Sequence, residues 1–406
     1  MRMRYNKMKN HKFEKVLIIV FFICFRIVRV YAQEPILFSY QRNFIRASLA
    51  TKASLLNDAA KDEKAAEFSG GLYETALKFV LDNGELLKDD PDMIALLGIA
   101  ARGAGGAGNK RSAETLWEIF QIYRDSHSRV ELLKAMGSLG KDNRSIIENL
   151  NQYLANQNNS FRSGMLPDYP VLGACVNALG ALGDSSSYPV LFSAMTCGYP
   201  QVYTDDAAKA LESLKGDYKE FLVEVIKKNP PPEKLAAFRL GALDKRFKES
   251  ERGELAETAL AVTLEFKTGS YDNLQAASSL RYAAVQSLTA LKWARASSLV
   301  IRNYYQVQTD FSNNAVPKER LLEAIACVGA MGNSESAQVL ALQLGYFNSQ
   351  MESRGEYDED IIAVLIKALG EIGDKVAFDY LLYIGYLNYP EQIQNAAREA
   401  LARLKW

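Results

Sequence analysis

The chain has 406 residues, and its 48 Lys and Arg residues equal its 48 Asp and Glu residues in number. That balance depends on a basic leader: without residues 1–32 the chain keeps 40 basic and 47 acidic residues, a net charge of −7. Nucleic-acid binding relies on Lys and Arg to neutralise phosphates. The composition therefore argues against a nucleic-acid partner.

Residues 1–32 have the features of a secretory signal peptide. A basic, polar stretch precedes ten apolar residues, "VLIIVFFICF" (16–25), and the segment ends with Val30 and Ala32 at the spacing of a cleavage site. Ten apolar residues are too few to cross a bilayer, which takes about 20. We predict cleavage after Ala32, export to the periplasm or cell envelope, and no transmembrane span in the mature chain. An uncleaved anchor is the alternative.

Residues 33–90 are predicted to form an N-terminal helical cap, since stretches such as 46–68 have a helical pattern. The next segment contains "GAGGAG" (103–108), which matches the GxGxxG pattern of dinucleotide-binding proteins. That motif needs a preceding strand, whereas both flanks have helical spacing. Asn109 also stands where a P-loop has lysine. We predict a glycine-rich turn and no bound cofactor.

A short motif recurs along the rest of the chain. "ALGALGD" (178–184) returns 190 positions later as "ALGEIGD" (368–374). Related stretches end at residues 142, 184, 216, 293, 333, 374 and 406, with "FRLGALDK" (238–245) as a degenerate copy. The period is about 40 residues, and apolar residues before and after each copy follow helical spacing. Each repeat is therefore predicted to be a helix, a tight turn and a second helix.

The residue types in the motif suit such a turn. Gly183 and Gly373 stand where a helix ends in the left-handed conformation. Asp184 and Asp374 follow as candidate N-caps of the next helix. Ala178 and Gly180 are small because neighbouring helices must approach closely there. The motif is thus predicted to serve packing, not catalysis.

This pattern resembles HEAT repeats, particularly the short bacterial HEAT-like class. The resemblance covers residues 91–406 and is strongest at 172–217 and 281–406, where 281–302 resembles a nearly complete unit. It implies an all-α fold, a right-handed α-solenoid of stacked helical hairpins. The signal fades at 217–280, where three prolines in "KKNPPPEK" (227–234) favour a bend.

No residue set in the sequence indicates catalysis or metal binding. His127 has no second histidine beside it in the sequence, and the pattern favours a surface residue. Cys175 and Cys327 are predicted to be small core residues. Cys175 and Cys197 lie about ten residues on either side of a predicted turn, so either a disulfide or two buried thiols would fit.

Aromatic residues recur 11 to 15 positions after the motif, often with acidic residues nearby. Since stacked units place their connections along one edge, we interpret them as a candidate partner-binding ridge, although each ring could instead seal the hairpin beneath it. The ridge residues are Tyr199, Tyr203, Asp205, Asp206, Tyr304, Tyr305, Tyr346, Phe347, Tyr386 and Tyr389.

The predicted function is that of a non-enzymatic exported scaffold or adaptor that binds protein partners, as the resemblance to HEAT proteins also implies. The alternative is a solenoid that binds carbohydrate or peptidoglycan through the aromatic ridge. A lyase-like enzyme is a third hypothesis, because some short HEAT-like repeats occur in chromophore lyases, but the sequence supplies no acid–base pair for it.

Overall fold

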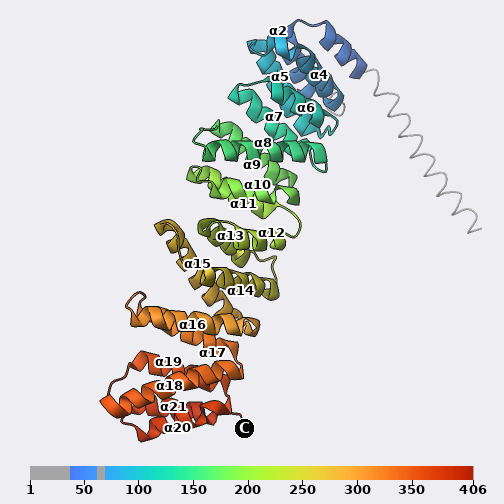
Figure 1. Ribbon diagram of the computed structural model, residues 1–406. Helices are drawn as coiled ribbons and strands as arrows, with labels where there is room; N and C mark the ends of the chain where they lie inside the picture. Colours follow the sequence, from blue (N-terminus) through green and yellow to red (C-terminus); the bar gives the residue numbers. More distant parts are fainter. Residues whose placement is uncertain (1–36, 62–68, 406) are drawn as a thin grey trace, which may run out of the picture. The chain divides into compact units, whose positions relative to one another are not determined.

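The computed structural model describes residues 37–61 and 69–405. The predicted signal peptide lies outside these residues. Within them the chain is helical and contains no strand, only an isolated bridge between Asp374 and Lys405. The prediction of an all-α fold is confirmed (Figure 1). In these ranges no helix is both long enough and apolar enough to pass through a membrane.

The chain divides into two compact units, one ending at Asp217 and the other starting at Tyr218. In the first, residues 37–46 form a helix that ends before Ala47, inside a stretch predicted to be one helix. The elements that follow are α2 (Leu49–Lys61), α4 (Ser69–Leu87), α5 (Pro91–Ala107), α6 (Ser112–Ile122), α7 (Ser126–Leu139), α8 (Arg144–Arg162), α9 (Tyr169–Leu182), the 3₁₀ turn η1 (Ser185–Ser187), α10 (Tyr188–Thr196) and α11 (Gln201–Ser213).

The second unit repeats the same kinds of element. They are α12 (Lys219–Lys228), α13 (Pro231–Leu243), α14 (Glu249–Glu265), α15 (Tyr271–Leu291), η2 (Ala294–Ala296), α16 (Ser297–Ser312), α17 (Lys318–Met331), α18 (Ser334–Arg354), α19 (Glu359–Ile372), η3 (Lys375–Ala377), α20 (Phe378–Tyr383), η4 (Ile384–Tyr386) and α21 (Glu391–Ala402).

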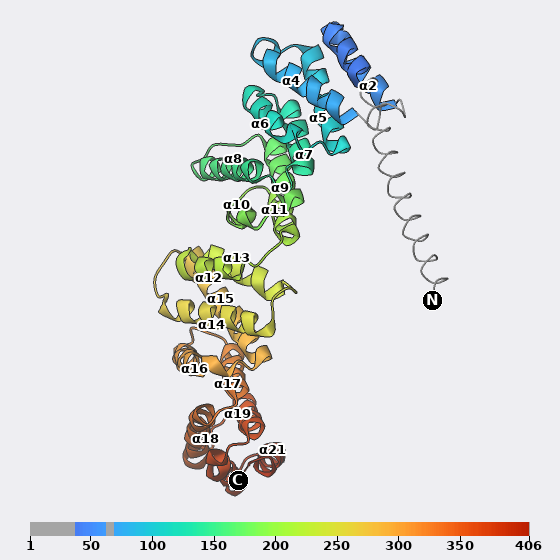
Figure 2. The same ribbon diagram turned by 90° about the vertical axis from the view of Figure 1, so that its right-hand side faces the viewer.

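Within each unit the helices pack in two layers, in the order of the sequence. In the first unit α5, α7, α9 and α11 contact one another in succession, and α6, α8 and α10 form the other layer. In the second unit α13, α15, α17, α19 and α21 make one layer, and α12, α14, α16, α18 and α20 make the other (Figure 2). Each helix thus buries its apolar face against its sequence neighbours, as repeat architectures require.

The glycine and aspartate of the repeated motif act as predicted. Gly183 and Gly373 end α9 and α19 with φ of 68° and 71°, the left-handed region that glycine enters without strain. The carboxylates of Asp184 and Asp374 then accept hydrogen bonds from the backbone N–H two residues later. A single 3₁₀ turn leads from each cap into the second helix. The chain reverses direction within these few residues.

The small residues of the motif lie where first-layer helices of successive repeats touch. A Cβ added to Gly180 would lie 2.9 Å from Cβ of Ala210, and one added to Gly370 would lie 2.9 Å from Cβ of Ala400. Contacts this short leave no room for a larger side chain. The interpretation of the motif as a packing device is confirmed.

The structural correspondence between residues 190 positions apart extends beyond the motif. Asp142 and Gly332 both have φ of 67°. The next residues, Asn143 and Asn333, cap α8 and α18 with their side chains. At the other end, Lys215 N–H donates to the carbonyl of Gly183 at 3.0 Å, and Lys405 N–H to that of Gly373 at 2.8 Å. Residues 142–215 and 332–405 are therefore two copies of one structural module.

The prolines at 230–232 start a helix instead of breaking one. α12 ends at Lys228, Pro230 is the N-cap of α13, and Pro231 is its first residue. Proline suits this position because its missing N–H would have no helical partner there. The degenerate motif copy at 238–245 lies on α13 and just beyond it.

Candidate binding groove

Two residues of the predicted ridge are buried and hold consecutive repeats together. Asn158 on α8 donates from Nδ2 to the carbonyl of Val190 at 3.0 Å, and its Oδ1 accepts from the Tyr199 hydroxyl at 3.0 Å. The side chains of Asn158 and Tyr199 are both buried. Burial raises the pKa of Tyr199, so this hydroxyl stays protonated and acts as the donor.

The second module copy contains the same pair 190 residues later. Asn348 Nδ2 donates to the carbonyl of Tyr380 at 3.0 Å, and Asn348 Oδ1 accepts from Tyr389 at 3.3 Å. We name these pairs the Asn–Tyr clamps. In these clamps Tyr199 and Tyr389 are buried inside the helical hairpins, so they present no surface to a partner.

The ridge residues of α11 are partly engaged with neighbours. Tyr203 is half-buried and stacks on Tyr169, with ring centroids 5.1 Å apart. The exposed Asp205 accepts a hydrogen bond from Gln201 at 2.7 Å, and Asp206 lies 3.7 Å from the Lys209 ammonium. These three residues form no hollow with the other ridge residues.

The remaining aromatic residues of the ridge were predicted to lie in the connections between units, and for most of them this is wrong. Tyr304 and Tyr305 lie on α16, and Tyr346 and Phe347 lie on α18, so they belong to helices and not to connections. Both helices run past the predicted loops, with Tyr304 buried on α16 and Tyr346 exposed on α18. Tyr386 alone of this set lies outside a regular α-helix, in η4, and it is 77% exposed.

Three ridge residues do come together, in a groove of about 500 Å³ between α16 and α18. We call it the α16–α18 groove. Helices α17 and α19 form its floor. The side chains that line it include Tyr304, Gln308, Gln343, Tyr346, Phe347 and Asp358. Its volume falls in the range typical of ligand pockets.

The aromatic side chains of the groove differ in exposure. Tyr346 is 57% exposed and packs edge-on against Phe347, with ring centroids 5.5 Å apart. Tyr304 is 1% exposed, and its hydroxyl has no hydrogen-bond partner among the described residues. Burial raises the pKa of Tyr304, so this hydroxyl is a neutral donor and acceptor. An unpaired buried hydroxyl costs about 1–3 kcal/mol.

Two glutamines supply the polar groups of the groove. Gln308 Nε2 donates to Gln343 Oε1 at 2.6 Å across it. This bond leaves the Gln308 oxygen and the Gln343 nitrogen without a partner in the described structure, so one acceptor and one donor face the groove. The sequence analysis did not single out either glutamine. Neither residue belongs to a repeated pattern that would have marked it.

One end of the groove carries a charge pair. Asp358 caps α19 and lies 3.2 Å from the Lys318 ammonium, which also binds Asp360. The pKa of Lys318 is raised, first by its hydrogen bond to Asp360 and then by that to Asp358. Lys318 therefore remains a cation, and its single charge offsets one of the two carboxylates at this end of the groove.

The first module copy fills the corresponding place with its own side chains. Tyr153 stands where the second copy has Gln343, and Arg129, which precedes the first copy, stands 190 residues before Glu319, which precedes the second. The Arg129 guanidinium lies 4.2 Å from the ring centre of Phe120 and 5.2 Å from that of Tyr153. The two modules thus share a backbone but differ at the groove.

The His, Cys, Asp and Glu side chains of the described residues do not gather into a metal site. No group of three or more His, Cys, Asp or Glu residues could hold a metal in residues 37–61 and 69–405. His127 is exposed. Cys175, Cys197 and Cys327 are free thiols, so the disulfide alternative is wrong. The Sγ of Cys175 lies against α8, 3.8 Å from the carbonyl of Leu150, whereas Cys197 lies beyond the end of α10.

The glycine-rich segment 103–108 ends a helix instead of forming a phosphate loop. All but its last residue belong to α5, and Gly108 caps that helix with φ of 67°. A Cβ on Gly103 would lie 2.2 Å from the ring of Tyr73, and so glycine is needed there for packing.

No protein-family model and no curated protein sequence matches the chain.

Proposed function

We propose that the chain is a non-enzymatic scaffold that binds an extended segment of a partner protein in the α16–α18 groove. One observation carries this proposal: Gln308 and Gln343 are joined by a single amide hydrogen bond, which leaves an amide acceptor on Gln308 and an amide donor on Gln343 in a groove that the exposed Tyr346 also lines. A peptide bond offers the complementary N–H and C=O. The aromatic rings suit an apolar side chain of the same segment.

The architecture we propose is a HEAT-like, right-handed α-solenoid with an N-terminal helical cap. The two-layer packing of helices in sequence order supports the repeat character within each unit. Such solenoids present long surfaces along which a partner segment can lie. This agreement is an analogy at the level of fold, and the groove carries the functional argument.

We also propose export, with a mature chain that starts at Gln33 and resides in the periplasm or cell envelope. The charge, length and end of residues 1–32 support it. Cell fractionation followed by N-terminal sequencing of the isolated protein tests this. Recovery from the cytosol with residues 1–32 intact would contradict export.

The groove is tested by site-specific photocrosslinking in the exported protein. A photoreactive phenylalanine at Tyr346 should crosslink to one defined peptide of a partner, and the same residue at Tyr386 serves as the control. Tyr386 is more exposed but lies outside the groove. Gln343→Ala should weaken binding of the purified partner about tenfold, since it removes one or two hydrogen bonds of roughly 1 kcal/mol each. Equal crosslinking at both positions would exclude the groove.

A second candidate function is carbohydrate or peptidoglycan binding. Tyr305, Tyr346 and Tyr386 are 49%, 57% and 77% exposed, and their rings offer flat faces on which sugars can stack. Co-sedimentation with purified cell wall distinguishes the two functions. Retention on cell wall that is lost when these three tyrosines become alanine would favour carbohydrate. Tyr199 is unsuited to this test because it is buried in a clamp.

A further inference from the structure

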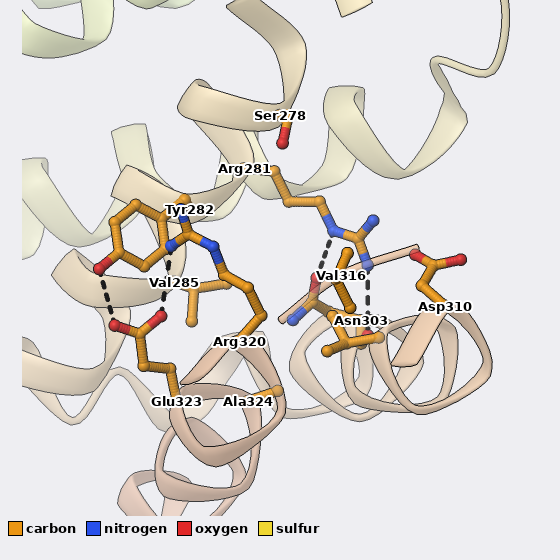
Figure 3. Close-up of a pocket in the computed structure, with 11 residues that line it drawn as sticks. Ser278, Arg281, Tyr282, Val285, Asn303, Asp310, Val316, Arg320, Glu323 and Ala324 are labelled. Carbon is orange, nitrogen blue, oxygen red and sulfur yellow. Dashed lines mark hydrogen bonds and ion pairs between the residues drawn. The ribbon is translucent and has the colours of Figure 1, made fainter. Parts of the chain in front are cut away.

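A second hollow lies between α15, α16 and α17, and has a volume of about 70 Å³ (Figure 3). Two arginines, Arg281 of α15 and Arg320 of α17, line it together with the carboxylates of Asp310 and Glu323. Val285 and Ala324 supply apolar wall. A water molecule takes about 30 Å³, so the cavity holds a group of only a few heavy atoms. We call it the Arg281 pocket.

The two arginines differ in how far their charge is compensated. The Arg320 guanidinium stacks 3.3 Å from the ring centre of Tyr282 and pairs with Glu323 at 3.3 Å. Glu323 also accepts a hydrogen bond from the Tyr282 hydroxyl at 2.7 Å. Arg320, Tyr282 and Glu323 thus satisfy one another, as the dashed lines on one side of Figure 3 show.

Arg281, by contrast, binds only neutral groups. Its Nε donates to Asn303 Oδ1 at 2.5 Å, and Nη2 donates to the carbonyl of Asn303 at 3.3 Å. A guanidinium has five N–H groups, so the rest of them have no protein acceptor in the described structure. No carboxylate lies within ion-pair distance of Arg281 in that part of the chain. Burial lowers the pKa of Arg281, with Asp310 opposing that effect from farther away.

A half-buried cation without an ionic partner is costly, and an anion delivered by a ligand removes that cost. We propose that the Arg281 pocket binds a carboxylate group, which accepts hydrogen bonds from the uncommitted N–H groups of Arg281. The planar fork of a guanidinium matches the two oxygens of a carboxylate. Asp310 and Glu323 line the same pocket, so a dianionic phosphate meets more repulsion than a carboxylate with one charge.

The cavity is large enough for a carboxylate group. The group can therefore come from a small free acid or from the C-terminus of a peptide. Acetate represents the first source. N-acetyl-glycyl-alanine represents the second, and its C-terminal amide is the matched control without the charge.

The test measures the melting temperature of the full exported chain against probe concentration, at constant ionic strength with chloride as the reference. Binding to the folded state stabilises it by RT ln(1 + L/Kd), where L is the free probe concentration, so the rise of the melting temperature with probe concentration gives a Kd. We expect acetate, the peptide acid or both to stabilise the protein more than chloride and phosphate do. The peptide amide should have no effect, and the more effective acid identifies the source.

Two variants address the pocket by different routes. Arg281→Gln should weaken carboxylate binding about tenfold to hundredfold, because it removes a charge-assisted hydrogen bond. Ser278→Phe covers the rim from an exposed position, leaves Arg281 in place, and should abolish binding without disturbing the core. Arg302→Gln, on the same α16, removes an exposed arginine that is paired with Glu265 and should change nothing.

The proposal fails if acetate and the peptide acid stabilise the wild type no more than chloride does. It also fails if Arg281→Gln and Ser278→Phe both retain the full response. The α16–α18 groove shares no lining residue with the Arg281 pocket. Tyr346→Ala should therefore leave carboxylate binding intact, which keeps this test separate from that of the partner groove.

Discussion

Replacing Asn158 with alanine tests whether the Asn–Tyr clamps stabilise the first unit. The change removes the hydrogen bonds to the Val190 carbonyl and from the Tyr199 hydroxyl, both at 3.0 Å. The lost bond to the Val190 carbonyl contributes about 1 kcal/mol, and leaving the Tyr199 hydroxyl buried and unpaired costs about 1–3 kcal/mol. We expect the free energy of unfolding to fall by about 2–4 kcal/mol.

The assay is urea unfolding followed by circular dichroism, with thermal melting as a second measure. For a unit of this size 1 kcal/mol corresponds to about 2–4 °C, so the melting temperature of the first unit should fall by roughly 5–15 °C. Asn159→Ala is the matched control, since Asn159 is the next residue and is exposed. Its effect should stay within about 0.5 kcal/mol.

A double-mutant cycle isolates the clamp itself. Tyr199→Phe removes only the hydroxyl, and combined with Asn158→Ala it should cost less than the sum of the single changes, by about 1 kcal/mol. Equal effects of Asn158→Ala and Asn159→Ala, or full additivity with Tyr199→Phe, would refute the assignment of a structural role to the clamp.

Two further predictions concern packing and thiol chemistry. Gly370→Leu should destabilise the second unit by about 2 kcal/mol or more, since even a Cβ there would lie 2.9 Å from Ala400. Gly106→Ala in α5, where nothing lies within 4 Å, should stabilise by up to about 1 kcal/mol, and urea unfolding of both variants checks the opposite signs. Burial raises the pKa of Cys175 to about 12 and that of Cys327 to about 11. Both thiols should therefore stay protonated and react slowly with a disulfide reagent at pH 8, and the stability they contribute should be lost as the pH rises from about 9 through these values. Rapid labelling of Cys175 in the folded protein at pH 8 would contradict this.

The features that could be predicted from the sequence are local ones. The role of Gly183 and Gly373 follows from the preference of glycine for the left-handed conformation at helix ends. The role of Asp184 and Asp374 follows from the preference of aspartate for the N-cap position. These rules act within a few residues of the chain. The structure confirms them together with the helical repeat.

The features that could not be predicted depend on residues far apart in the sequence. The buried Tyr199, for example, donates its hydroxyl hydrogen bond to Asn158, which lies 41 positions away in the sequence. That pairing becomes visible in the sequence only when the 190-residue offset is extended to Asn348 and Tyr389. The groove and the Arg281 pocket each need side chains from three or more helices, and no spacing rule brings these together.

The location of Tyr304 and Tyr305 within a helix could have been predicted from the sequence. Residues 297–316 contain neither glycine nor proline, so nothing in them ends α16 at these tyrosines. In α18, Gly345 lies next to Tyr346 inside a continuous helix. A Cβ at that glycine would lie 2.7 Å from the ring of Tyr380.

The reversals after α9, α15 and α19 have one fixed length. In each, two residues separate the helix from a 3₁₀ turn: Gly183 and Asp184, Lys292 and Trp293, and Gly373 and Asp374. The segments that follow α8, α16 and α18 differ in length. Additions to the chain are therefore better placed in the segments after α8, α16 and α18 than in these three reversals. An epitope tag or a reporter domain belongs in residues 163–167, where it leaves the phase of the repeats unchanged.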